Sequence, residues 1–179
     1  MLELLNKESI MSEYPLKKII RYNHRNRLQD ESVAEHTCFV SLFCLKIMAQ
    51  LNLTLEQERQ VLILAALHDT CESITSDIPH DVKANYPEMQ KILDKVEFDY
   101  YEKNWKCYLE EVYKPDDLVY NIIKLADAYS VQQWCINERI LGNRSDSVSE
   151  IYLESEIRIN KYTNIINDII VKKGQAYVI

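Results

Sequence analysis

The segment VLILAALHDTCES, residues 61–73, shows the pattern from which the fold of this chain can be worked out. Seven apolar residues, 61–67, run directly into His68 and Asp69, and Glu72 follows three positions after the aspartate. An apolar run of this length within a periodic segment predicts a helix that packs into the core. Burying ionisable side chains at the end of such a helix costs free energy unless a partner compensates them. The segment therefore indicates a helical core with a polar site at its edge.

The rest of the chain has the composition of a helical protein. Its 179 residues include two glycines and four prolines, and 47% of them are hydrophobic, which suits one domain with a substantial core. Helical periodicity dominates and no segment alternates like a strand, so the fold is predicted to be all-α, a single helical bundle over residues 1–179. The expected helices cover these ranges: 2–11, 15–20, 33–50, 55–69, 87–113 as one helix or a pair, 116–141, and 147–172. The polar segments 21–32 and 76–83 are expected to be loops.

Capping residues support three of these helix boundaries. Ser32, with Glu35 three positions later, has the spacing of a capping box in front of the helix that begins at residue 33. Thr54 precedes the next helix as an N-cap. Gly142 follows the long helix over 116–141 and indicates its C-terminal end.

Composition also excludes classes of function. The two glycines are far apart, so neither a phosphate-binding P-loop nor a dinucleotide fingerprint can form. The formal net charge of −7 argues against a nucleic-acid polymer as partner. The five cysteines form no C-x-x-C pair, which favours reduced thiols in a cytoplasmic protein. We recognise no signal peptide and no apolar run long enough to span a bilayer, so no membrane association is expected.

Four ionisable residues lie on the buried sides of three predicted helices. They are His36, His68, Asp69 and Asp127. A lone buried aspartate is costly to ionise, but two imidazoles and two carboxylates that meet around a divalent cation are compensated. Such a mixed nitrogen and oxygen set suits Mn²⁺, Co²⁺, Fe²⁺, Ni²⁺ or Zn²⁺ better than Mg²⁺ or Ca²⁺. The sequence therefore predicts a site for a divalent transition metal.

Each of these residues also has a purely structural interpretation. His36 alone is typical of a hydrogen-bonded core histidine, and Asp127 alone of a carboxylate bonded to neighbouring helix ends. His68 and Asp69 can mark a helix C-terminus, where an imidazolium complements the helix dipole. The metal hypothesis depends on the combination of the four residues, with Glu72 close to them.

Four motifs resemble those of a known family. They are ESVAEH (31–36), HDTCE (68–72), TSDIPHDVK (75–83) and KLADA (124–128), and they resemble the HD-domain phosphohydrolases of the 5′-deoxynucleotidase type. The resemblance covers residues 15–140, whereas the predicted last helix carries no motif. It implies an all-α bundle, commonly a homodimer or higher homo-oligomer, that uses a divalent metal to cleave phosphate from small-molecule deoxynucleotides.

The resemblance also implies roles for individual residues. It assigns His36, His68, Asp69 and Asp127 as metal ligands. Glu72 corresponds to the catalytic carboxylate, with Arg21 and Asp69 as its catalytic partners. The residues that correspond to substrate contacts are Arg21, Tyr22, Asp77, Ile78, Pro79, His80 and Lys83. A guanidinium suits phosphate, and an aromatic face suits a nucleoside base.

Two positions that correspond to phosphate-binding residues differ from the family pattern. Tyr22 stands where close relatives often have tryptophan, and Gln29 stands where many have arginine. His24, Arg25, Arg27 and Lys83 are further basic residues that can contact phosphate.

The expected activity is release of phosphate from deoxyribonucleoside 5′-monophosphates. One alternative is a deoxynucleoside triphosphohydrolase that uses those basic residues and Lys124 on the additional phosphates. A second alternative is a metal- and nucleotide-sensing module without turnover, against which Glu72 counts. A third is an all-helical interaction domain, which leaves the buried charges unexplained.

Overall fold

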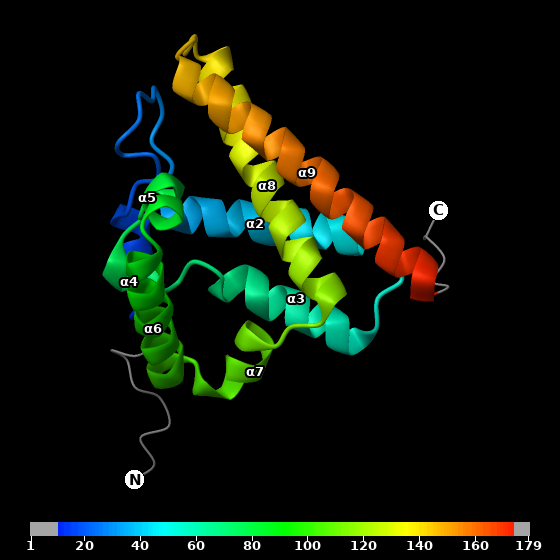
Figure 1. Cartoon of the computed structure of the whole chain (residues 1–179). Coiled ribbons are helices and arrows are strands. Elements are labelled where there is room, and N and C mark those ends of the chain that lie inside the picture. Colours follow the sequence, from blue (N-terminus) through cyan, green and yellow to red (C-terminus); the bar gives the residue numbers. More distant parts are fainter. Residues whose placement is uncertain (1–10, 174–179) are drawn as a thin grey trace.

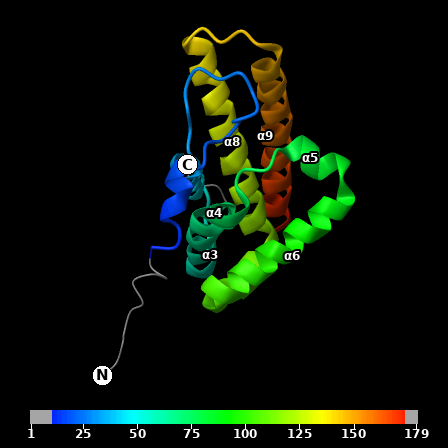
Figure 2. The same cartoon turned by 90° about the vertical axis from the view of Figure 1, so that its left-hand side faces the viewer.

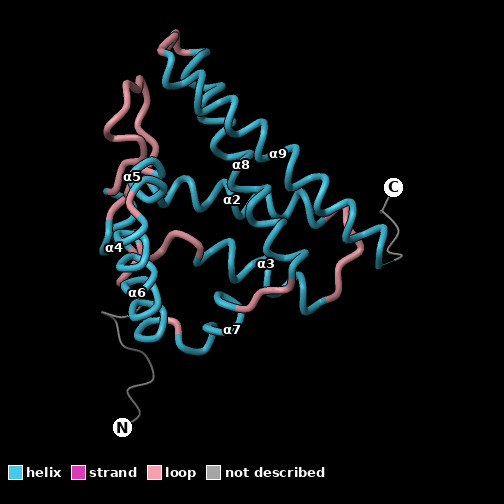
Figure 3. Tube along the Cα trace, viewed as in Figure 1, coloured by secondary structure: helices cyan, strands magenta, loops and turns pink. Residues whose placement is uncertain are grey.

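The computed structural model describes residues 11–173, and over this range it forms helices and turns with no named strand (Figure 1, Figure 3). The predicted all-α class is therefore confirmed. An isolated antiparallel bridge joins Ile20 to Ser32 and closes the loop between them. The elements follow in this order: η1 (Tyr14–Lys18), α2 (Val33–Met48), α3 (Leu55–Leu67), α4 (Glu72–Thr75), α5 (His80–Asn85), α6 (Pro87–Asn104), η2 (Lys106–Tyr108), α7 (Leu109–Tyr113), α8 (Asp117–Ile140) and α9 (Asp146–Lys173).

The two longest helices, α8 and α9, lie side by side and run in opposite directions (Figure 1, Figure 2). Helices α2 and α3 pack against α8, and together these four helices enclose the main apolar core. Its fully buried members include Val40, Val61, Leu118 and Ile122. Helices α4, α5 and α6 lie together at the left of Figure 1, beyond the end of α3 from which the chain continues into α4. Helix α8 is therefore the central element, and it carries Asp127.

The predicted caps of α2 and α8 are present. Ser32 Oγ accepts a hydrogen bond from the Glu35 amide at 3.2 Å, and a Glu35 carboxylate oxygen accepts one from the Ser32 amide at 2.8 Å. Gly142 has φ +102°, a conformation that glycine adopts without strain. The Asn143 amide then donates to the Glu138 carbonyl at 2.9 Å, as expected for a Schellman turn.

Some boundaries differ from the sequence prediction. Helix α3 ends at Leu67 rather than at residue 69, and a tight turn separates it from α4. The segment predicted as one helix or a pair over 87–113 is α6 followed by η2 and α7, with Trp105 in a non-helical conformation between them. Residues 15–20 contain a 3₁₀ helix that ends at Lys18.

The predicted loop over 76–83 contains the start of helix α5. Pro79 is extended, with ψ 137°, and its carbonyl accepts hydrogen bonds from the amides of Val82 and Lys83. A proline lacks an amide hydrogen and has a fixed φ, so it suits the position directly before a helix. The helix predicted over 2–11 lies outside the described residues except for Met11. Within residues 11–173, no helix has both the length and the apolar character that crossing a membrane requires.

Candidate active site

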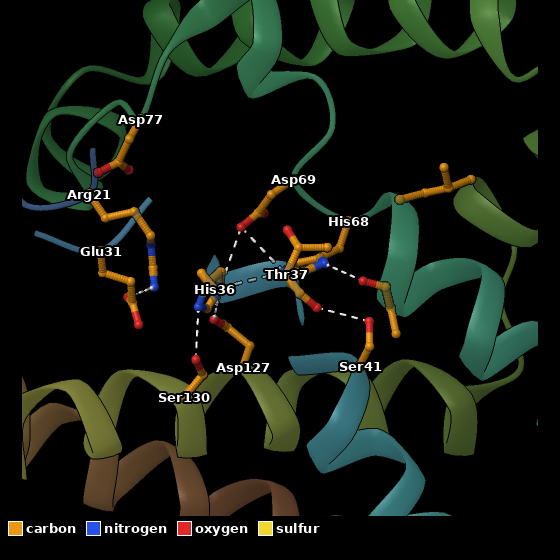
Figure 4. Close-up of polar contacts among 12 residues, drawn as sticks. Arg21, Glu31, His36, Thr37, Ser41, His68, Asp69, Asp77, Asp127 and Ser130 are labelled. Atoms are coloured by element: carbon orange, nitrogen blue, oxygen red, sulfur yellow. Dashed lines mark hydrogen bonds and ion pairs between the residues drawn. The ribbon is translucent and has the colours of Figure 1, made fainter. Parts of the chain in front are cut away.

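His36 ends the first turn of α2 and is completely buried. It belongs to the apolar stripe of Val33 and Val40, as predicted. Its Nδ1 atom lies 3.0 Å from Ser130 Oγ on α8, so Nε2 is the ring nitrogen that faces the other polar residues (Figure 4). Burial and the nearby positive charge of Arg21 lower the pKa of His36 to about 4. The imidazole is therefore neutral at pH 7 and can offer a lone pair.

His68 and Asp69 follow the last turn of α3. His68 Nδ1 lies 3.0 Å from the carbonyl oxygen of Ala65, which can only accept, so Nδ1 carries a proton and Nε2 faces the site. Asp69 Oδ2 lies 3.2 Å from His68 Nε2 and 3.4 Å from His36 Nε2. Burial lowers the pKa of His68, but the Asp69 carboxylate outweighs burial and raises it.

Asp127 reaches the same point from the middle of α8. Its Oδ1 atom lies 3.3 Å from His36 Nε2, and its Oδ2 atom accepts a hydrogen bond from Arg158 on α9. Burial opposes ionisation of this carboxyl group. The hydrogen bond with His36 and the charges of Arg158 and Arg21 outweigh burial and hold the pKa of Asp127 well below its usual range.

These side chains can hold a metal ion. One donor atom each of His36, His68 and Asp69 lies within 4.8 Å of the other two, and Asp127 Oδ1 adjoins His36 at the edge of this group. Metal–ligand distances of about 2.0–2.2 Å for nitrogen and oxygen place ligands across one ion about 4 Å apart. The donor set is mixed nitrogen and oxygen, and both imidazoles are oriented through Nδ1. The residues therefore fit a divalent transition metal.

Glu72 begins α4, one turn after Asp69. Its Oε2 atom is buried and has no hydrogen-bond partner within the described part of the chain. Burial, together with the negative charges of Asp69 and Asp77, raises the pKa of Glu72 to about 9. A carboxyl group with such a pKa is protonated at pH 7 and can donate a proton, which is the property of a general acid.

We name the candidate ligands His36, His68, Asp69 and Asp127 the metal-ligand group. A cavity of about 500 Å³ opens beside it. Asp69, Glu72 and Asp127 line its floor, and α8 and α9 contribute Lys124 and Arg158 to its wall. The residues predicted to bind substrate that line this cavity are Arg21, Tyr22, Asp77, Ile78, Pro79 and Lys83. The side chain of His80 lies outside what the structure describes. A volume of this size suits a mononucleotide-sized ligand.

Arg21 and Tyr22 are held in place by several contacts. Arg21 Nη1 forms an ion pair with Glu31 Oε2 at 3.0 Å. Tyr22 has φ +55°, a left-handed conformation that costs about 1–3 kcal/mol for a side chain of this kind. Its amide donates to Asp77 Oδ2 at 3.1 Å, and its ring stacks on Trp134 with centroids 4.1 Å apart. The contacts with Asp77 and Trp134 compensate the backbone strain.

The further basic residues are placed in two ways. His24, Arg25 and Lys124 line the cavity, so they can reach a ligand in it. Arg27 instead forms an ion pair with Asp30 at 2.7 Å and is not among the cavity-lining residues.

Four residues of the site have no counterpart in the sequence prediction. Ser130 orients His36, Glu31 pairs with Arg21, Glu138 binds backbone amides of the loop over 21–32, and Arg158 contacts Asp127. Ser130 could have been found, because it follows Asp127 by three residues and so shares its helix face. Glu31 lies ten residues after Arg21 in the same loop, a spacing without a periodic signal, whereas the contacts of Glu138 and Arg158 join segments that are distant in the sequence.

Comparisons with known proteins agree with this arrangement. The family model described as 5′-deoxynucleotidase YfbR-like matches residues 10–172. A 5′-deoxynucleotidase of Yersinia pseudotuberculosis is 27% identical, and the match covers 82% of this chain and 81% of that protein.

Solved structures share the fold at low identity. An HD-domain phosphohydrolase from Listeria innocua has a TM-score of 0.67 at 20% identity, covering 93% of this chain and 89% of that one. An HD phosphohydrolase from cyanophage S-2L, bound to dA and one catalytic Zn²⁺ ion, has a TM-score of 0.61 at 18% identity, covering 89% and 99%. Because the family model spans nearly the whole described chain, this protein belongs to the YfbR-like 5′-deoxynucleotidase family.

Proposed function

We propose that this protein is a divalent-metal-dependent phosphohydrolase that releases inorganic phosphate from deoxyribonucleoside 5′-monophosphates. The observation that carries the proposal is the convergence of His36, His68, Asp69 and Asp127 at the edge of a cavity that Glu72 also lines. The pKa of Glu72 is raised to about 9, and its Oε2 atom has no hydrogen-bond partner among the described residues. Membership of the family and the deoxynucleotidase named among its relatives support the substrate class.

The metal would be held by His36, His68, Asp69 and Asp127. A divalent ion supplies positive charge that polarises a phosphoryl oxygen and acidifies a water molecule. Arg21 lies in the same cavity and its fork of N–H donors matches two phosphate oxygens. Asp69 remains ionised, because burial raises its pKa less than His68 lowers it, and its carboxylate can accept a hydrogen bond from the attacking water.

Glu72 supplies the proton that the reaction needs at the leaving group. Cleavage of the phosphorus–oxygen bond leaves negative charge on the 5′-oxygen of the nucleoside. Glu72 is protonated at pH 7 and its Oε2 atom makes no competing hydrogen bond within the described chain, so its proton can pass to that oxygen. A positioned acid of this kind contributes about 10²–10⁴-fold to rate.

A metal and substrate screen tests the proposal. Chelated protein is reloaded with Mn²⁺, Co²⁺, Fe²⁺, Ni²⁺ or Zn²⁺ and incubated with deoxyribonucleoside mono- and triphosphates, and the products are separated by ion-exchange chromatography. We expect inorganic phosphate from the monophosphates. Tripolyphosphate from the triphosphates would instead establish the triphosphohydrolase alternative. Nucleotide binding without any product would establish the non-catalytic module.

The proposal includes self-association and a cytoplasmic location. Phe39, Leu42 and Leu45 expose between 46% and 49% of their surface along α2, which leaves an apolar face for a second copy of the chain. All five cysteines are free, as a reducing compartment requires. Light scattering after size-exclusion chromatography measures the oligomeric state, and a monomer at micromolar concentration would contradict the first part.

A further inference from the structure

Helix α9 carries no family motif, yet one of its side chains enters the active site. Arg158 extends from α9 to Asp127, donates a hydrogen bond from Nη2 to Oδ2, and lines the cavity that Arg21 and Glu72 also line. Its side chain is 36% exposed, so the guanidinium is anchored at one edge and open at another. An arginine that served only to solvate the surface of α9 would not need to reach the active site.

Several N–H donors of the Arg158 guanidinium have no acceptor among the described residues. A guanidinium carries five N–H donors in a planar fork, and Asp127 is the one described residue that accepts a hydrogen bond from Arg158. An arginine guanidinium stays protonated over the whole pH range in which a protein is folded. The group is therefore a permanent cation whose remaining donors are available to a ligand in the cavity.

Among the described residues, Asp127 is the ion-pair partner of Arg158, although Glu150 and Glu154 of α9 also line the cavity. Arg21 already forms an ion pair with Glu31 at 3.0 Å, so part of its charge is neutralised within the protein. Asp127, the partner of Arg158, belongs to the predicted metal ligands and would share its charge with the bound ion. A phosphate dianion beside that ion then meets the charge of Arg158.

We propose that Arg158 is a second substrate-binding arginine, which contacts the phosphate group through the N–H donors that Asp127 does not use. The inference rests on the proposed function for its substrate but concerns a residue outside the family motifs. Asp127 anchors the long side chain, so little conformational entropy is lost when phosphate binds. Two guanidiniums, from the loop before α2 and from α9, then hold one phosphate beside the metal.

Binding of inorganic phosphate to protein reconstituted with Co²⁺ tests the inference without depending on turnover. Arg158→Gln removes the charge and most of the donors, and isothermal titration calorimetry measures the dissociation constant for phosphate. We expect phosphate to bind about 10- to 100-fold more weakly, as for loss of charge-assisted hydrogen bonds, with cobalt content unchanged. Arg158→Lys keeps a cation without the fork and should lie between the two proteins.

The matched control is Lys172→Gln, which removes one positive charge from an exposed position near the end of α9, away from the cavity. It should bind phosphate like the parent protein. Two outcomes overturn the inference: Arg158→Gln with full cobalt content and parental phosphate affinity, or Arg158→Gln that loses cobalt, which would assign Arg158 to the orientation of Asp127. If the parent hydrolyses no deoxynucleotide but binds phosphate in an Arg158-dependent way, the proposed function fails and this inference stands.

Discussion

The metal-ligand group and the loop over residues 21–31 face the same cavity but are held in different ways. The candidate metal ligands lie on or directly after regular helices, and two of them share the turn that follows α3. The loop has little regular structure and is bound to parts of the chain more than a hundred residues away. Substitutions in the first region should therefore abolish chemistry, whereas substitutions that release the second should weaken substrate binding.

Glu138 is the main anchor of the loop. It is completely buried on α8, and its carboxylate accepts hydrogen bonds from the amides of Leu28 and Gln29, each at 2.8 Å. The side chain of Asn143 donates to the same carboxylate at 2.7 Å and to the carbonyl of Asn26 at 2.9 Å. No described cation contacts the Glu138 carboxylate. The amide donors therefore compensate the cost of burying it. The Schellman turn at the end of α8 places Asn143 where it can make both bonds.

The largest effect is expected in the metal-ligand group. The double substitution His68→Ala and Asp127→Ala removes one ligand from each of two elements, so the protein should lose its metal and at least about 10³-fold in turnover, because a metal supplies several kcal/mol of transition-state stabilisation. Elemental analysis of protein purified without chelator measures the metal. Full occupancy in the double variant would remove these residues from the ligand set.

The second-largest effect is expected at Glu72, where a substitution should lower kcat without loss of the metal. Glu72→Gln keeps the size of the side chain but cannot donate an acidic proton, so kcat should fall by about 10²-fold or more while metal and nucleotide still bind. In the metal-loaded parent protein, kcat should decline at alkaline pH, because the protonated form of Glu72 is the active one and its pKa is raised above the usual range.

The pH dependence of the free energy of unfolding of Glu72→Gln, compared with the parent, tests whether the pKa of Glu72 is raised in the folded protein. The pKa of Glu72 is raised from 4.5 in the unfolded chain to about 9 in the folded one. The stability that it contributes is therefore complete below pH 4.5 and is lost as the pH rises through about 9. Glu72→Gln should lack this loss, so its stability relative to the parent should increase between pH 5 and pH 9. A constant difference between the two proteins over this range would contradict the raised pKa.

The sequence could single out the four candidate ligands because their signals are local. His36 and Asp127 lie within apolar helical stripes, and His68 with Asp69 ends an apolar run, so periodicity alone predicted buried sides. His36 is completely buried, and the other three are partly buried. The loop could be identified only as polar and without periodicity. Its partners, Glu138 and Asn143, resemble ordinary residues at a helix end, and Arg158 resembles a charge on a solvated face. Which distant segments meet depends on the packing of α8 and α9, and no pattern within either helix encodes it.

Release of the loop should affect substrate binding and leave the metal in place. Glu138→Ala removes the acceptor of the amides of residues 28 and 29, and an unsatisfied group costs about 1–3 kcal/mol where water cannot replace that acceptor. We expect the KM for a deoxynucleotide to rise about tenfold or more and the unfolding midpoint to fall, with parental metal content. The control Glu102→Ala removes an exposed carboxylate of α6 that does not line the cavity, and it should leave KM unchanged. Loss of metal from Glu138→Ala would show that the two regions are not separable.

The smallest effect is expected at Asp77, which contacts the loop through Tyr22 and lines the cavity. Its carboxylate accepts a hydrogen bond from the Tyr22 amide at 3.1 Å and lines the cavity beside Ile78 and Pro79. Pro79 has a fixed φ and restricts Ile78, so this turn should hold the carboxylate against a sugar hydroxyl. A site that pairs closely with the sugar leaves little room for an added 2′-hydroxyl, so kcat/KM should be higher for dAMP than for AMP.

Two variants separate the contact with the sugar from the contact with Tyr22. Asp77→Ala removes both and should lower kcat/KM for dAMP about tenfold, with metal content intact, as for loss of a charge-assisted hydrogen bond. Asp77→Asn keeps an acceptor oxygen for the Tyr22 amide but loses the charge. If Asp77 acts on the sugar, Asp77→Asn should lose most of the preference for dAMP. If it acts only by holding the strained backbone of Tyr22, Asp77→Asn should keep that preference. Equal kcat/KM for dAMP and AMP in the parent would mean that this loop does not select the sugar.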